Sequence, residues 1–317
     1  MKWIVGVDTV AVVVGIVATM TVPAQTVTPD TATLKLFPPE TQGLAFVDFA
    51  GLRSAPLFNE MVYQKLPKLP RELGEFAEAT GFDIPRDVER LTLGYIGRNS
   101  VVAIVQAKYD KFKVEQFVKD KADHIQTETY LGRVIYNGGP HGDGDHAGIS
   151  FIDNLIVAGS ISGVKQAIDR LAAPAPSVVD GDLIPQIRTI GASNQVWAVG
   201  KFDPSMLSTV APGIPEKAGE MLSSFKSGTY QMRIDQDLHA RISGTFSTPE
   251  MAKATYDLGR GLLGVAQLQF EKEEKLKQLL GGLSMDTNGQ TVTVTFNATG
   301  DLLKDLEAQK AGLLKKR

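Results

Sequence analysis

LTLGYIGRNSVVAIVQA, residues 91–107, is the stretch that decides the fold. Two runs rich in Leu, Ile and Val, residues 91–96 and 101–107, flank the polar turn GRNS at 97–100. Apolar runs of this length around a short turn that contains glycine predict a β-hairpin. The first half of the chain is therefore expected to contain antiparallel sheet.

The second half follows the same plan. A hairpin is predicted at residues 229–234 and 238–246, around the polar turn DQD at 235–237. Buried-strand patterns precede both hairpins, LAFVDF at 44–49 and QVWAVGKF at 195–202. The pattern in each half therefore predicts a strand, a helix, a hairpin, a helix and a strand, in that order.

This order is typical of a split β-α-β, or ferredoxin-like, unit. We expect an α+β protein of two tandem ferredoxin-like units, with antiparallel sheet and helices on one face. Either the two sheets remain separate or they merge into one layer. The Ala- and Pro-rich stretch AAPAPS at 172–177 marks the boundary between the units.

The remaining elements follow from periodicity and punctuation. Pro67 and Pro70 should split a helical stretch at 57–80, because proline removes an amide donor. Asp110 should cap the helix after the first hairpin. Other helices are expected at 110–122, 162–171, 215–225, 249–280 and 301–314, and other strands at 128–136, 147–152, 155–158 and 290–296.

The N-terminus carries an almost wholly apolar run, residues 3–22, after Lys2. It has the positive start, apolar core and small residues (Val22, Ala24) of a cleaved secretory signal. It is also long enough to be an uncleaved membrane anchor, although Asp8 is costly within a bilayer. A buried N-terminal strand is the third reading. The first two both place the protein outside the cytoplasm.

The domain organisation expected from these patterns has five parts. They are a signal peptide or membrane anchor (1–24), a tether (25–37), a first α+β unit (38–173), a linker (174–177) and a second α+β unit (178–317).

Composition excludes several classes of function. The chain of 317 residues has no cysteine, so it has no disulfide, thiolate metal site or cysteine nucleophile. Its net charge of −3 offers no concentrated basic face for nucleic acid. Because of the apolar run 3–22, we expect an extracytoplasmic protein, either periplasmic or anchored in the inner membrane and facing the periplasm. The oligomeric state does not follow from composition.

Five short blocks resemble a family of uncharacterised bacterial envelope proteins. They are FPPET (37–41) before LAFVD (44–48), TGFDIPRDVERL (80–91), YLGRVIY (130–136) and FIDNLIVAG (151–159). The resemblance covers mainly residues 37–173. It implies an N-terminal signal or anchor followed by an extracytoplasmic α+β region, and it carries no activity or functional residues.

Motifs of catalysis are lacking in the sequence. The closest approach to a nucleophile elbow, GSISG at 159–163, centres on Ile161 instead of serine. The chain has neither a phosphate-binding loop nor a His-Glu-x-x-His motif, and it has only four histidines. We expect a protein that is not an enzyme and that needs no cofactor.

One segment has metal-binding chemistry. The glycine-rich loop NGGPHGDGDHAG at 137–148 brings together His141, Asp143, Asp145 and His146. Imidazole and carboxylate ligands suit zinc, manganese or nickel. The alternative is a solvated loop between two strands, since a metal would have to offset the entropy of ordering the glycines.

The function we predict is that of a non-catalytic envelope module, either structural or binding another envelope protein or a surface. A second possibility is a periplasmic carrier in which the apolar helix at 251–268 covers a pocket for a hydrophobic ligand. The alternative to this carrier, which we favour, is that Leu258, Leu262 and Val265 of that helix simply pack on the sheet. A third possibility is a metal-dependent hydrolase that uses the loop at 138–148.

Overall fold

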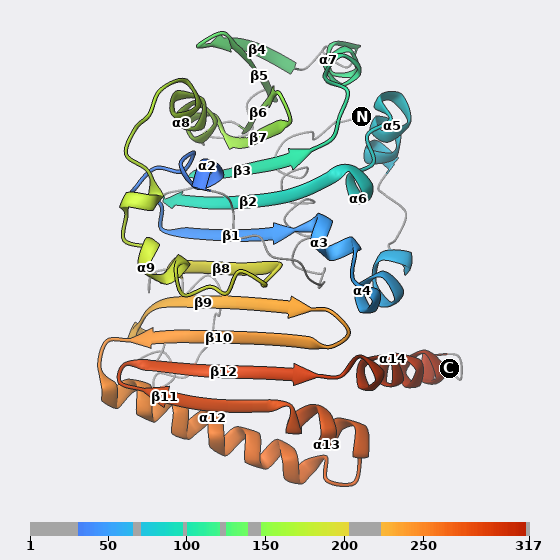
Figure 1. Ribbon diagram of the computed structural model, residues 1–317, viewed down its shortest axis with the longest axis vertical. Helices are drawn as coiled ribbons and strands as arrows, with labels where there is room; N and C mark the ends of the chain where they lie inside the picture. The colour runs from blue at the N-terminus through green and yellow to red at the C-terminus, as the bar shows by residue number, and fades with distance from the viewer. Residues whose placement is uncertain are drawn as a thin grey trace.

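The computed structural model describes residues 31–65, 71–97, 100–120, 125–138, 147–202 and 223–314. Its strands form one antiparallel sheet of 12 strands in the order β11-β12-β10-β9-β8-β1-β2-β3-β7-β6-β5-β4 (Figure 1). The strands of the first half are β1 Gly43–Asp48, β2 Val88–Gly97, β3 Ser100–Ala107, β4 Ile125–Tyr130, β5 Arg133–Gly138, β6 Ala147–Ile152 and β7 Leu155–Ser160. Those of the second half are β8 Val196–Lys201, β9 Phe225–Ile234, β10 Leu238–Phe246, β11 Leu283–Asn288 and β12 Thr291–Ala298. The expected α+β class with antiparallel sheet is confirmed.

The two halves merge into a single layer. β1 and β8 pair antiparallel at the middle of the sheet, in a register that runs from Gly43 opposite Gly200 to Val47 opposite Val196. The question that the sequence left open is thereby answered, because no break separates the two sheets.

Strand order repeats between the halves. The first half reads β1-β2-β3-β7-β6 from the centre outward and the second reads β8-β9-β10-β12-β11. The hairpin β4-β5 is an addition at the outer end of the first half. In the first half β7 lies between the parallel strands β3 and β6, and in the second half β12 lies between the parallel strands β10 and β11. A connection that contains helix joins the two parallel strands of each half, which is the split β-α-β arrangement.

Tandem ferredoxin-like units are not confirmed. The strand beside β3 is β2, which comes just before β3 in the chain and forms a hairpin with it. In a ferredoxin-like unit, the last strand of the unit would occupy this position beside β3. β9 occupies the same position beside β10. Each half thus shares only part of the expected unit.

Helical segments connect these strands. In the first half they are α2 Thr31–Leu34, α3 Phe49–Arg53, α4 Pro56–Met61, η1 Tyr63–Lys65, α5 Arg71–Thr80, α6 Ile84–Asp87, α7 Lys111–Asp120 and α8 Ile161–Ala172. After them come η3 Val178–Asp180, α9 Ile184–Ile187, α12 Pro249–Gln269, α13 Glu274–Gly281 and α14 Gly300–Leu314.

Helices cover both faces of the first half, so the expectation of helices on one face is wrong. Alternate residues of a strand point to opposite faces. Val102 and Ile104 of β3 lie in a core cluster with Val164 of α8, and we call this side face A. Val105 and Ala107, one residue out of phase, lie in a different cluster with Val114 of α7 on the other side, face B.

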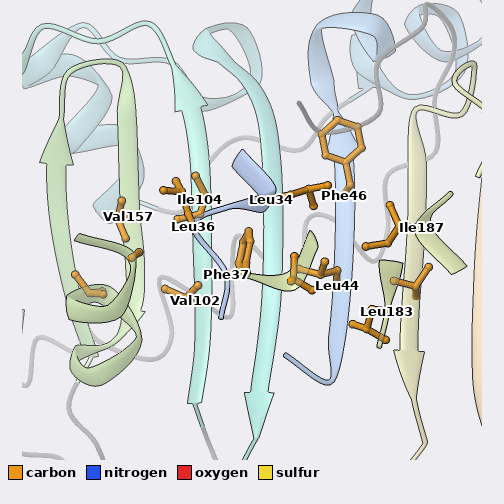
Figure 2. Close-up of a cluster of buried hydrophobic side chains, with 14 of the residues drawn as sticks. Leu34, Leu36, Phe37, Leu44, Phe46, Val102, Ile104, Val157, Leu183 and Ile187 are labelled. Carbon is orange, nitrogen blue, oxygen red and sulfur yellow. The ribbon is translucent and has the colours of Figure 1, made fainter. Parts of the chain in front are cut away.

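The core on face A includes residues before β1 (Figure 2). Leu34, Leu36 and Phe37, which we expected in the tether, are buried against Leu44 and Ile104. The proline and threonine residues around these three positions suggested a loop. The side chains of Leu34, Leu36 and Phe37 instead pack against the face-A side of β1–β3. The folded body therefore starts earlier than position 38.

Gly94, in the hairpin stretch LTLGYI, makes room for Phe37. A Cβ at position 94 would lie 2.3 Å from the ring of Phe37, which is fully buried. The glycine inside an otherwise apolar strand is thus explained by a close approach of another chain segment.

Several predicted elements are confirmed. β2-β3 and β9-β10 are the two predicted hairpins. The predicted cap is present, since the Asp110 carboxylate accepts hydrogen bonds from the Phe112 and Lys113 amides at 3.1 and 3.2 Å.

Other local predictions are wrong. The single strand expected at 128–136 is the hairpin β4-β5, which turns at Leu131 and Gly132 with φ of 45° and 74°. The single helix expected at 249–280 ends at Gln269, and α13 begins after a break. The strand β11 was not foreseen, because the LSMDTN pattern followed what was read as a continuous helix.

The apolar run 3–22 and most of the expected helix 215–225 lie outside the described residues. Among the helices that the structure does describe, none combines the length and apolar character needed to cross a membrane.

Candidate binding surfaces

The predicted metal ligands belong to the glycine-rich loop between β5 and β6. His141, Asp143, Asp145 and His146 lie in residues 139–146, outside the described ranges. Within the described ranges, no group of three or more His, Asp or Glu side chains is placed to hold a metal ion. The candidate sites in the described part of the chain are therefore surfaces.

Side chains on face A change character at the boundary between β8 and β9. Residues directly opposite each other on antiparallel strands share a face. One row crosses the sheet through Ile104, Thr92, Phe46 and Trp197, all buried, and continues through Gln231, Arg241, Thr295 and Ser284. The row is thus largely apolar on the first half and wholly polar on the second.

The neighbouring rows on the second half are also polar. We call the resulting surface the open face, since none of the helices that the structure describes is drawn across β10 and β12 in Figure 1. None of its side chains is buried. Its residues are Ser227, Thr229, Gln231 and Arg233 of β9, His239, Arg241, Ser243 and Thr245 of β10, Thr291, Thr293, Thr295 and Asn297 of β12, and Ser284, Asp286 and Asn288 of β11.

Hydrogen bonds between neighbouring strands hold some of these side chains in place. The hydroxyls of Ser243 and Thr293 are 3.0 Å apart. His239 Nδ1 lies 2.8 Å from Asn297 Oδ1. At the inner border, the Asn194 amide donates to Gln231 Oε1 at 3.1 Å. The open face is therefore a partly ordered array of hydroxyl and amide groups.

Charge on the open face is sparse and separated. Arg233 and Arg241 lie on the two inner strands, and Asp286 lies on the edge strand β11. The open face contains neither lysine nor glutamate, residues that protein interfaces disfavour. A flat polar surface of this kind suits recognition through hydrogen bonds more than the enclosure of a small molecule.

α12 carries a second unusual surface. Leu258, Leu262 and Val265, which we expected to pack on the sheet, are 51%, 62% and 63% exposed, and Leu268 is 74% exposed. The expectation is wrong because another side of α12 contacts the sheet. A Cβ at Gly259 would lie 2.5 Å from Met285 of β11, and Ala252 is fully buried. We call the four exposed side chains the α12 stripe.

This orientation bears on the carrier hypothesis, which stays a prediction. That hypothesis required the apolar side of the helix to cover a pocket. The α12 stripe instead faces solvent, so its apolar side chains line no enclosed space in the part of the chain that the structure describes.

A pocket of about 320 Å³ lies elsewhere, beside the end of α5 and the start of α7. Burial raises the pKa of its Tyr109 to about 12, and the Tyr109 hydroxyl donates to the Leu155 carbonyl at 2.9 Å. A hydrogen bond from Arg86 holds the pKa of Asp87 below its ordinary value. Since these polar groups already have structural partners, the pocket does not point to catalysis.

Asp48 is the carboxylate that burial perturbs most clearly. It is 2% exposed, and burial raises its pKa although Gly51, Arg90 and Arg53 favour the charged form. Its Oδ1 accepts a hydrogen bond from the Gly51 amide at 3.1 Å. Asp48 is therefore the N-cap of α3 and stabilises the end of β1.

The open face was not recognised from the sequence, although a signal was present. In TVTVTFNA, residues 291–298, threonine alternates with apolar residues, and in LHARISGTF polar residues fall at 239, 241, 243 and 245. Strict alternation predicts a strand with one solvated side. What the pattern could not show is that four such strands lie side by side.

Comparison with protein-family models, with curated proteins and with solved structures found no match to this chain.

Proposed function

We propose that this protein is a non-catalytic module of the bacterial cell envelope that binds another envelope protein through the open face. The observation that carries the proposal is the change along face A. The same sheet that buries Phe46 and Trp197 under helices has, on its next four strands, only polar side chains on face A, and none of them is buried.

The polar side of an antiparallel sheet is often simply solvated. Two features favour binding here. The open face lacks lysine and glutamate, although basic and acidic residues number 33 and 36 in the whole chain. Its side chains are also linked across strands, so that ordering them on binding costs little entropy.

The extracytoplasmic location is part of this proposal. It rests on the apolar run 3–22. Fractionation of the native host with N-terminal sequencing tests it. A periplasmic protein that starts after Ala24 indicates a cleaved signal, and a membrane-bound protein that retains Lys2 indicates an anchor; a cytoplasmic protein contradicts the location.

The tandem ferredoxin-like architecture is likewise a proposal about origin. The repeated strand order supports two copies of one ancestral unit, in which the split β-α-β part is retained and a preceding strand takes the place of the last one. The first copy would then have gained the hairpin β4-β5.

Site-directed cross-linking tests the binding role of the open face. Because the chain has no cysteine, an Arg241→Cys variant carries one thiol, on the open face, to which a photo-cross-linker can be attached. Phe112→Cys, at a 73% exposed position on α7, is the matched control. The proposal predicts a discrete protein adduct in the host envelope from position 241 and none from position 112.

The outcomes separate the possibilities. A polysaccharide adduct from position 241 would indicate a cell-wall ligand in place of a protein. Equal labelling from both positions, or none from position 241, would show that the open face is only solvated.

A further inference from the structure

The strand β4 forms an open edge of the sheet in the described part of the chain. It is the last strand in the sheet order, at the top of Figure 1, and it pairs only with β5. The opposite edge strand, β11, differs because α12 and α13 pack against it. One end of the sheet is therefore covered by helices and the other is not.

The turn of the hairpin β4-β5 decides which backbone groups of β4 face outward. Leu131 and Gly132 both have positive φ, which is typical of a two-residue type I′ turn. In such a hairpin the flanking residues Tyr130 and Arg133 exchange two backbone hydrogen bonds, and bonded and non-bonded pairs alternate from there along the strands. The N–H and C=O groups that point away from β5 are therefore those of Ile125, Thr127 and Thr129.

A hydrogen bond on the other side of β5 agrees with this alternation. Val134 lies opposite Thr129, and its carbonyl accepts a hydrogen bond from the Ser150 hydroxyl of β6 at 2.8 Å. The Val134 carbonyl thus points away from β4, as expected for a non-bonded pair. Backbone bonds from other described segments do not reach Ile125, Thr127 or Thr129. Their outward groups can therefore pair with a further strand.

Protection of the kind that edge strands usually carry is lacking in β4. Proteins blunt such edges with lysine, proline, bulges or a covering helix. The sequence IQTETY at 125–130 has neither lysine nor proline, and its register with β5 has no bulge. Its one charged residue, Glu128, is paired with Lys165 of α8 at 2.7 Å, and the Tyr130 hydroxyl donates to Asp169 of α8 at 2.8 Å. These contacts on face A hold the strand in place and leave its edge open.

We propose that two copies of this chain pair antiparallel through β4, so that their sheets join across a twofold axis. A symmetric register centred on Thr127 places Thr127 opposite its own counterpart and Ile125 opposite Thr129. It is the symmetric register that brings all three outward-facing residues of both copies into bonded pairs. This contact is separate from the open face, because β4 and β11 are at opposite ends of the sheet.

The side chains of β4 complement themselves in this register. Glu128 of one copy lies opposite Gln126 of the other, and threonine faces threonine at the axis, a favourable cross-strand pair. A register centred on Glu128, or a parallel in-register pair, would instead place the two Glu128 side chains beside each other, which is unfavourable. A twofold dimer needs such self-complementarity, and it favours a second copy over a strand of another protein.

The short length of the contact sets the strength of the dimer. In each copy only Ile125, Thr127 and Thr129 contribute outward-facing backbone groups. Association also has to offset the loss of translational and rotational freedom. The dimer is therefore weak and reversible, and it forms as the protein concentration rises.

Sedimentation equilibrium of the natively processed protein tests the proposal. We expect wild type to dimerise with concentration and Thr127→Lys to weaken association by at least about tenfold, because like charges then meet at the axis. Thr189→Lys, which adds the same charge at an exposed threonine after α9, should leave association unchanged. An equal mixture of Thr127→Lys and Thr127→Glu should recover association, since opposite charges then face each other.

Two results of this experiment overturn the proposal. One is a wild-type monomer at every concentration up to the solubility limit, and the other is a Thr127→Lys dimer as strong as wild type. If the purified protein stays monomeric and a photo-cross-linker at position 127 captures a different protein in the host envelope, the edge belongs to a foreign strand and not to a second copy.

Disulfide formation between introduced cysteines tests the register, since no other thiol competes. Position 127 meets its own counterpart with a Cα–Cα distance of about 5.5 Å in a bonded pair, within reach of a disulfide. The two copies of position 129 lie ~14 Å apart at about 3.4 Å per residue. Oxidation should therefore link Thr127→Cys into a covalent dimer and leave Thr129→Cys, an equally exposed class of position on the same strand, monomeric. Equal linking of both variants, or linking of Thr129→Cys alone, overturns the register.

Discussion

Phe46 of β1 stacks on Trp197 of β8, with ring centroids 5.6 Å apart, across the line where the two halves of the sheet meet. Both rings are buried, and β1 and β8 are the innermost strands of their halves. The aromatic pair therefore belongs to both halves and should couple their unfolding.

Truncation of this pair should destabilise the whole protein. Trp197→Ala is expected to lower the free energy of unfolding by about 3–5 kcal/mol, because a large buried side chain is lost and leaves a cavity. Trp197→Phe should cost less, since no described residue accepts a hydrogen bond from the indole Nε1. Urea unfolding followed by circular dichroism measures both, with one transition expected for the two halves. Two separate transitions in wild type would contradict the coupling.

Gly94→Ala should be destabilising by about 1–3 kcal/mol, because the added methyl group meets the buried Phe37 ring and forces the core to shift. Gly74→Ala is the control: an added Cβ on α5 meets nothing within 4 Å, and alanine should stabilise that helix by up to about 1 kcal/mol. Phe37→Leu should recover part of the loss in the Gly94→Ala background. Thermal denaturation of the four variants checks the set, and equal effects of both glycine substitutions would refute the close-contact explanation.

The contribution of Asp48 to the free energy of unfolding should decrease as the pH rises. Its folded-state pKa is raised by burial, so the folded protein binds the proton more tightly than the unfolded chain. The stabilising contribution is full below the ordinary aspartate pKa and is lost as the pH passes through the raised value. Asp48→Asn keeps an oxygen acceptor for the Gly51 amide and removes this dependence, so its stability relative to wild type should increase between pH 3.5 and 7.

Asp87 supplies the control of opposite sign. A hydrogen bond from Arg86 lowers its pKa, so its contribution is present above the ordinary aspartate pKa and is lost as the pH falls through the lowered value. Asp87→Asn should therefore lose stability relative to wild type as the pH rises through the acidic range. Urea titrations at several pH values measure both variants, and slopes of the same sign would contradict the assignment.

Metal binding by the glycine-rich loop at 138–148 stays a prediction, and a solvated loop is the alternative to it. If His141 and His146 bind zinc, titration of wild type should release heat and raise the melting temperature, and the double variant His141→Ala/His146→Ala should show neither effect. Calorimetry with zinc chloride measures both. An unchanged melting temperature of wild type would leave the loop as a solvated connection.

Local signals were sufficient for the hairpins. Apolar runs around GRNS and DQD correctly predicted β2-β3 and β9-β10, because turn chemistry acts between neighbouring residues. The cap at Asp110 was predicted for the same reason.

Long-range relationships were not predictable in this way. The burial of Phe37 depends on Gly94, more than 50 positions away, and a glycine in a strand does not reveal which ring will fill the space. The exposure of Leu258 and Leu262 depends on which side of α12 meets β11, a strand that the sequence reading missed. The open face and the α12 stripe were missed for this reason, since each is defined by neighbours from other elements.

The pairing of β1 with β8 has a consequence for the order of assembly. Ribosomes and export channels deliver a chain from its N-terminus, so β1 emerges about 150 residues before Val196 begins its partner strand. During that interval one edge of β1 is an unsatisfied template for foreign strands. A chaperone that binds the nascent first half until residue 201 has emerged would prevent foreign strands from pairing with the free edge of β1.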